Sequence, residues 1–111
     1  MRTLALSALL LALPLGASAQ ATEIQETLRQ AHPAIRACVE RSVAAGEQPA
    51  DRVDVMTRIE PSGRVSEARV SRPEAHPRFA RCVESAVERL RFPRQAEAVT
   101  VRFPLWTAPR R

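Results

Sequence analysis

The chain lacks several of the features by which common classes of protein are recognised. Its two cysteines do not form a C-x-x-C pair, which argues against thioredoxin-like exchange and covalent haem attachment. No serine stands in the glycine-flanked turn that holds a hydrolase nucleophile. The longest apolar run, Leu4–Leu15, has twelve residues, whereas a membrane-spanning helix needs about 20. We therefore expect no transmembrane anchor.

Lysine is also absent, so all seventeen basic residues are arginine, against twelve acidic residues and a net charge of +5. Many of these charges alternate at helical spacing, as in Arg36 with Glu40, Glu74 with Arg78 and Glu88 with Arg91. Such pairs are typical of a solvated helix face. Nucleic acid is therefore not an expected partner.

The first residues have the pattern of a secretory signal peptide. Arg2 supplies a basic start, Leu4–Leu15 the apolar run, and Ala17-Ser18-Ala19 the small residues at a cleavage site. Cleavage after Ala19 would leave a mature chain that starts at Gln20. No cysteine near the cut offers a lipid attachment point. The pattern predicts a soluble protein that is periplasmic or secreted.

One thirteen-residue pattern occurs twice, as AHPAIRACVERSV from Ala31 to Val43 and as AHPRFARCVESAV from Ala75 to Val87. Each copy carries one of the two cysteines, so two equivalent helices would present Cys38 and Cys82 in the same orientation. In an oxidising compartment an even number of cysteines indicates pairing, and we expect a Cys38–Cys82 disulfide. The alternative is two buried free thiols, which act as small apolar side chains.

The apolar periodicity changes along the mature chain from helical to strand-like and back. Pro33 and Pro77 suit the first turn of a helix, although Pro33 could instead kink one longer helix. Residues 52–60, 65–71 and 98–105 alternate as strands, and residues 61–64 have turn chemistry. We divide the chain into a signal peptide (1–19), a short lead-in helix (20–30), a disulfide-stapled domain (31–107) and a basic tail (108–111).

This order predicts a two-layer αββαβ fold of the α+β class, with a three-stranded antiparallel sheet and both helices on one face. A right-handed crossover through the second helix would place the strands in the order two, one, three. Pro104 cannot donate to a ladder, which suits an edge strand. The uncovered face would then present Met56, Arg58, Arg102 and Trp106, a composition typical of interfaces. Trp106 could instead complete the edge of the core.

Several of these motifs together resemble the AgmX/PglI C-terminal domain family, one of the TonB-like C-terminal domains. They are the two Cys-Val-Glu helices, the strand and turn from Ile59 to Val65 with Gly63-Arg64-Val65, and the Phe92-Pro93 step. The resemblance covers roughly residues 31–106. It implies an envelope interaction module and not an enzyme, with strand addition at a sheet edge as one way of binding a partner. The membrane helix and proline-rich span of a TonB-type energy transducer are missing here, so force transmission is not implied.

Catalytic and metal-binding alternatives fit the spacing less well. His32, Cys38, His76 and Cys82 could be counted as a zinc set, but each His precedes its Cys by six residues, about 240° around a helix. Glu40 and Glu84 lie two residues after the cysteines and are expected in solvent. The sequence thus predicts no metal, no cofactor and no catalytic residue.

The leading expectation is an exported, non-catalytic module of the cell envelope that binds an unidentified envelope protein. The contact would use a sheet edge or the face with Met56, Arg58, Arg102 and Trp106. One alternative is a structural component that associates with itself, for example as a homodimer. A small secreted enzyme or inhibitor is the remaining alternative.

Overall fold

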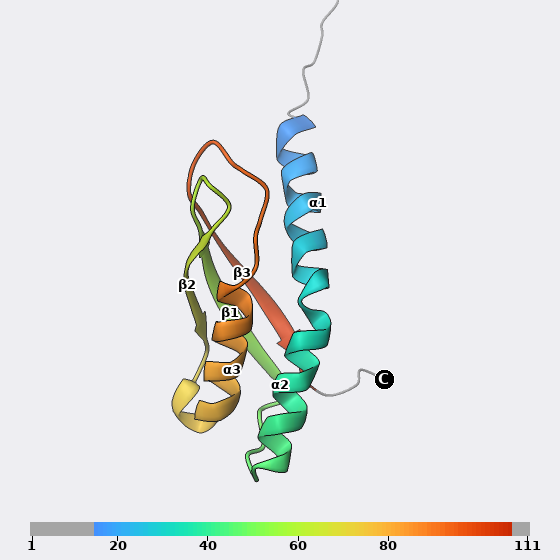
Figure 1. The fold of residues 1–111 in the computed structure, drawn as a ribbon, viewed down its shortest axis with the longest axis vertical. Coiled ribbons are helices and arrows are strands. Elements are labelled where there is room, and N and C mark those ends of the chain that lie inside the picture. The colour runs from blue at the N-terminus through green and yellow to red at the C-terminus, as the bar shows by residue number, and fades with distance from the viewer. Residues whose placement is uncertain (1–14, 108–111) are drawn as a thin grey trace, which may run out of the picture.

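The computed structural model describes residues 15–107 as a small α+β domain with three helices and a three-stranded antiparallel sheet (Figure 1). In chain order the elements are α1 (Leu15–Gln30), α2 (His32–Ala44), β1 (Arg52–Ile59), β2 (Val65–Val70), the 3-10 turn η1 (Pro73–Ala75), α3 (Pro77–Glu88) and β3 (Val99–Trp106). The predicted basic tail, 108–111, lies outside the described residues. No helix within 15–107 is long and apolar enough to cross a membrane.

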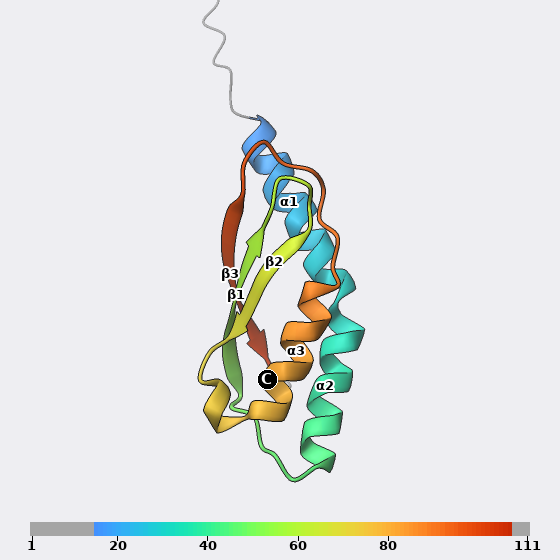
Figure 2. The ribbon, with the colours of Figure 1, turned by 60° about the vertical axis from the view of Figure 1, so that its left-hand side comes forward.

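The first two helices follow one another almost without interruption and form a rod beside the rest of the domain (Figures 1 and 2). Ala31 separates them but keeps helical dihedral angles, and its carbonyl accepts the amide of Ile35 at 3.0 Å. Pro33 lies in the first turn of α2, where its missing N–H is not needed. Most of the predicted signal peptide, residues 1–14, lies outside the described residues, and α1 runs across the predicted cleavage point after Ala19.

The strands are ordered β2-β1-β3, which confirms the predicted order and places Pro104 on an outer strand. Alternate residues of β1 are buried on one side of the sheet, namely Val53, Val55, Thr57 and Ile59. β1 and β2 are joined by a turn in which Gly63 has a φ of +93°. That conformation is accessible to glycine because it has no Cβ.

The core lies between this buried face and α3. Phe79, Val83 and Val87 of α3 and Val55 of β1 have no exposed surface. Each contributes about 1.5 to 3 kcal/mol by leaving water. A smaller cluster joins Ile24 of α1 to Ile59 and Phe92, so the helical rod also takes part in the core. Figure 2 shows the helices on the same side of the sheet.

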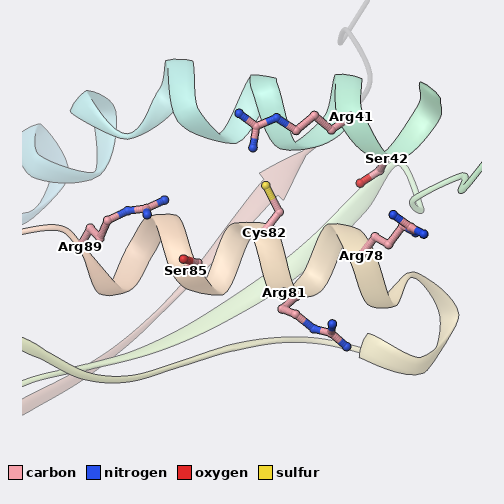
Figure 3. A pocket seen from close by; sticks show the side chains of 7 residues that line it. All are labelled: Arg41, Ser42, Arg78, Arg81, Cys82, Ser85 and Arg89. Carbon is pink, nitrogen blue, oxygen red and sulfur yellow. The ribbon is translucent and has the colours of Figure 1, made fainter. Parts of the chain in front are cut away.

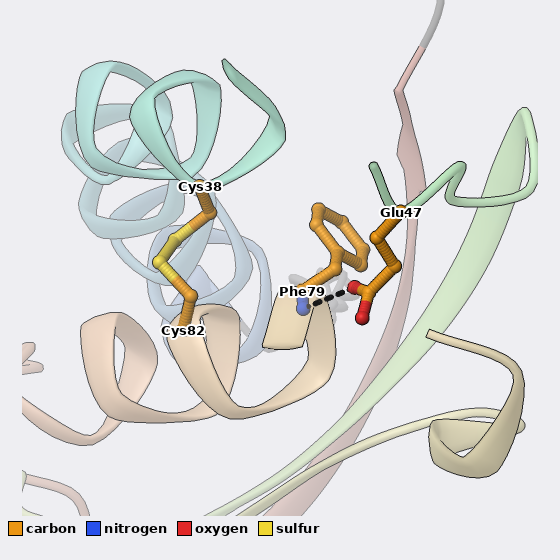
Figure 4. Close-up of a disulfide and its surroundings, with 4 residues drawn as sticks. All are labelled: Cys38, Glu47, Phe79 and Cys82. Atoms are coloured by element: carbon orange, nitrogen blue, oxygen red, sulfur yellow. Dashed lines mark hydrogen bonds between the residues drawn. A yellow bond between two sulfur atoms is a disulfide. The ribbon is translucent and has the colours of Figure 1, made fainter. Parts of the chain in front are cut away.

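Two contacts fix α3 to its surroundings (Figure 4). Cys38 of α2 and Cys82 of α3 form a disulfide with their Cα atoms 5.6 Å apart, which confirms the predicted pairing. At the start of α3, the Glu47 carboxylate accepts the amides of Arg78 at 3.0 Å and Phe79 at 2.7 Å. These amides would otherwise lack a partner at the helix N-terminus. Glu47 therefore caps a helix that lies thirty residues further along the chain.

Candidate functional site

The four residues predicted for the uncovered face of the sheet occupy alternate positions on β1 and β3. Met56 lies directly opposite Arg102, which makes the two side chains close neighbours across the strands. Arg58 is opposite Thr100, and Trp106 is at the far end of β3 with about half of its surface (48%) exposed. The structure thus brings Met56 and Arg102 together and places Arg58 and Trp106 on either side of them.

Two further arginines on this face were missed by sequence reasoning. Arg52 is opposite Trp106, with its guanidinium carbon 5.7 Å from the ring centroid, within the range of a cation–π contact. Arg69 of β2 is opposite Met56, so Met56 lies between Arg69 and Arg102. These three residues border a shallow hollow of about 250 Å³. The alternation in β2, combined with the hairpin register, was the signal that could have identified Arg69.

Most arginines of this face have an acidic partner two residues away along the chain. Arg52 pairs with Asp54 at 3.2 Å and Arg58 with Glu60 at 3.1 Å, while Arg69 pairs with Glu67. Exposed pairs of this kind contribute about 0 to 1 kcal/mol, so they can exchange partners at little cost.

These contacts shift the pKa values of Glu60 and Arg69. The Ser66 hydroxyl donates to Glu60 at 2.6 Å and, together with Arg58, holds the pKa of the Glu60 carboxyl below its ordinary value. The hydrogen bond to Glu67 raises the pKa of Arg69. Arg102 differs because no ion pair or hydrogen bond engages its guanidinium within residues 15–107. Arg102 is therefore the uncompensated positive charge on this face, and it lies beside the thioether of Met56.

The outer edge of β3 is interrupted by a proline. The Thr107 amide donates to the Asp51 carbonyl at 2.8 Å, which makes these two residues a hydrogen-bonded pair. Because such pairs alternate along an antiparallel ladder, Pro104, opposite Asp54, falls in a pair that is not hydrogen-bonded. Its nitrogen therefore faces the outer edge, where a proline has no hydrogen to donate. A partner strand added to this edge of β3 would form one backbone hydrogen bond fewer at Pro104.

The outer edge of β2 is partly occupied by a helix side chain. The Ser71 amide donates to the Asp54 carbonyl, so the amide of the preceding Val70 points away from β1. That amide donates to the Glu84 carboxylate at 3.0 Å. The expectation that Glu84 is simply solvated is therefore wrong, because Glu84 is half-buried and joins α3 to β2.

The residues considered for a metal site are separated or already engaged. Both cysteines are in the disulfide, and His32 is exposed on α2. His76 is buried, with Nε2 3.0 Å from the Ser71 carbonyl oxygen and its ring edge-on to Phe79. Among residues 15–107 there is no group of three or more His, Cys, Asp or Glu side chains arranged to hold a metal ion.

Comparison of the chain with protein-family models, with curated proteins and with solved structures gives no match. The binding chemistry open to the sheet face therefore follows from its own side chains. It offers guanidinium donors, a flexible thioether and an exposed indole on a rigid, strand-built surface.

Proposed function

We propose that this protein is an exported, non-catalytic module of the cell envelope that binds a protein partner through the uncovered face of its sheet. The leader-like start of the sequence and the Cys38–Cys82 disulfide support a periplasmic or secreted location, because disulfides persist in oxidising compartments. The two-layer αββαβ arrangement of the TonB-like domains and membership of the AgmX/PglI C-terminal domain family belong to the same proposal. They rest on the motifs of the sequence and on the β2-β1-β3 strand order.

The observation that carries the proposal is the position of Met56 between Arg69 and Arg102, with Trp106 exposed further along β3. Arginine, tryptophan and methionine are enriched at protein interfaces, and arginine and tryptophan dominate their binding energy. A methionine adapts its shape to the partner because it is unbranched and polarizable. We place the partner on the face and not on an edge, because Pro104 interrupts one edge and Glu84 occupies an amide of the other.

Site-specific photo-crosslinking tests this assignment in the cell envelope of the native host. A photoreactive amino acid at position 56 should give a discrete crosslinked protein, whereas the same group at Arg36, exposed on α2, should not. Arg102→Glu should reduce the crosslink at position 56 at least tenfold, and Trp106→Ala should weaken it. Equal crosslinking from both positions, or a product that neither substitution changes, would contradict the sheet-face assignment.

Self-association is the second candidate, and one observation favours it. The sheet face carries both signs of charge in exposed pairs, such as Arg52 with Asp54 and Arg58 with Glu60, so two copies could exchange these pairs across an isologous contact. Sedimentation velocity distinguishes the candidates, because a homodimer shows a sedimentation coefficient that rises with protein concentration. In that case the crosslinked product at position 56 would have twice the mass of the chain.

A further inference from the structure

A second surface, on the opposite side of α3 from the sheet, gathers four arginines (Figure 3). It is a groove of about 360 Å³ between α2 and α3, which we call the basic groove. The sulfur of Cys82 lies at its centre, so the disulfide that joins the helices forms part of its floor. Its lining residues are Arg41, Ser42, Arg78, Arg81, Cys82, Ser85 and Arg89.

The arginines are distributed along the groove and do not converge on one point. Arg78 lies in the first turn of α3 and Arg89 directly follows its last residue, eleven residues later and about 16 Å away at the rise of an α-helix. Figure 3 shows Arg41 of α2 and Arg89, at the end of α3, extending into the space beside Cys82, and Arg78 lying near Ser42. Arg81 leaves α3 on the side away from α2. Three guanidinium groups thus follow the length of the groove.

Most of the positive charge of the basic groove is unpaired within the described part of the chain. No hydrogen bond or ion pair engages the guanidinium groups of these four arginines among residues 15–107. Glu47 interacts electrostatically with Arg78 and offsets part of the charge at that end of the groove, although its carboxylate oxygens accept hydrogen bonds from the amides at the start of α3. The sheet face differs in this respect, because three of its four arginines have acidic neighbours.

The form of the basic groove favours an extended acidic peptide over a compact phosphate group. A phosphate site usually gathers backbone amides at a helix N-terminus, and the first amides of α3 are already taken by Glu47. An extended peptide presents every second side chain to the same side at intervals of about 6.6 Å. Three alternate carboxylates therefore span about 13 Å, close to the length over which the arginines lie. Guanidinium groups bind carboxylates through two parallel hydrogen bonds.

We infer that the basic groove binds an acidic segment of a protein, in an extended conformation, across α2 and α3. Ser85 borders the same groove and is partly exposed, so its hydroxyl can donate to the peptide backbone, whereas Ser42 is buried beneath the groove. This site goes beyond the proposed function and does not depend on it, because its residues lie on the helices and not on the sheet face.

Fluorescence anisotropy with a fluorescein-labelled five-residue peptide, in which glutamate alternates with serine, tests the inference. We expect the domain to bind this peptide at low ionic strength and to bind its glutamine counterpart at least tenfold more weakly. Arg41→Glu combined with Arg89→Glu should reduce binding at least tenfold. Arg36→Glu combined with Arg64→Glu changes the net charge equally outside the groove, and should reduce binding less than threefold.

Equal loss in the two double variants would overturn the inference, because binding would then follow net charge alone. Tight binding of the glutamine peptide, or binding of short-chain polyphosphate without the glutamate peptide, would also overturn it. Chemical-shift changes at the Ser42 and Ser85 amides on addition of the glutamate peptide give a second readout in the unaltered domain. Their absence at a saturating peptide concentration would contradict the site.

The proposals for the sheet face and for the basic groove can be contradicted independently of each other. Arg102→Glu and Trp106→Ala should leave binding of the glutamate peptide unchanged. Conversely, the Arg41 and Arg89 double variant should leave photo-crosslinking from position 56 unchanged.

Discussion

Gly63 is the residue whose substitution the backbone tolerates least. Its φ is +93°, and a Cβ at this position would lie 2.0 Å from the carbonyl oxygen of Phe92. The two segments are also joined by a hydrogen bond of 2.9 Å from the Phe92 amide to the Gly63 carbonyl. The turn after β1 and the Phe92-Pro93 step therefore meet backbone to backbone, which leaves no room for a side chain.

We expect Gly63→Ala to lower the free energy of unfolding by about 3 kcal/mol or more, since it adds a steric clash to an unfavourable φ. Gly46→Ala is a matched control, because Gly46 has a φ of +88° but a Cβ added there would meet nothing within 4 Å. Gly46→Ala should lower the free energy of unfolding by only about 1 kcal/mol. Urea unfolding of the two variants checks the difference, and equal costs would contradict the close approach of Phe92.

Among the elements, α3 depends on a carboxylate from another part of the chain. Partial burial raises the pKa of Glu47, but the hydrogen bonds from the Arg78 and Phe79 amides outweigh this effect. The pKa of Glu47 in the folded protein is therefore below its ordinary value. A carboxyl group with a lowered pKa stabilises the fold above its ordinary pKa, and this contribution is lost as the pH falls through the lowered value.

Glu47→Gln should therefore make the domain less stable at neutral pH and should bring its stability closer to that of the unaltered domain in acid. The checking measurement is the urea midpoint at a series of pH values from neutral to about 3. Glu97→Gln serves as the control, because Glu97 is exposed and its carboxylate makes no hydrogen bond or ion pair within residues 15–107. A Glu47→Gln variant that kept the full pH dependence would refute the capping role.

The elements were predictable from the sequence because each depends on local periodicity and on proline and glycine signals. The ion pairs between charged side chains of these elements could not be predicted in the same way. The predicted pair Glu74 with Arg78 does not form, because Glu74 belongs to η1 and His76, with a φ of −153°, separates it from α3. The predicted pair Glu88 with Arg91 fails because α3 ends at Glu88. Helical spacing permits contact only when both residues lie in one helix, and it does not ensure contact there, since Arg36 and Glu40 of α2 form no ion pair within residues 15–107.

At the scale of the whole molecule, a surface can be predicted from the sequence more easily when the pattern within its own elements determines which side chains it contains. The positions of Met56 and Arg102 on one face followed from alternation within two strands and the predicted strand order. The basic groove requires the position of α2 relative to α3; the predicted disulfide brings the two helices together, but no spacing in the sequence specifies which of their arginines line the space between them. Helical spacing pairs Arg78 with Glu74 instead, which conceals the place of Arg78 in the groove.

The relative position of α2 and α3 depends in turn on the disulfide. Cys38 and Cys82 are separated by 44 residues, and closing a loop of this length stabilises a fold by about 4 kcal/mol on the chain-entropy model. A domain of this size buries only about 60 to 65% of its unfolded surface, so this contribution is a large share of its stability.

We expect Cys38→Ala combined with Cys82→Ala to lower the free energy of unfolding by about 4 kcal/mol. A reductant should destabilise the unaltered domain by a similar amount and should have no effect on the double variant, which serves as its control. Because the cysteines also hold the two walls of the basic groove together, the double variant should bind the glutamate peptide more weakly even where it remains folded. Unchanged stability in the double variant would show that packing of α2 on α3 holds the helices without the covalent link.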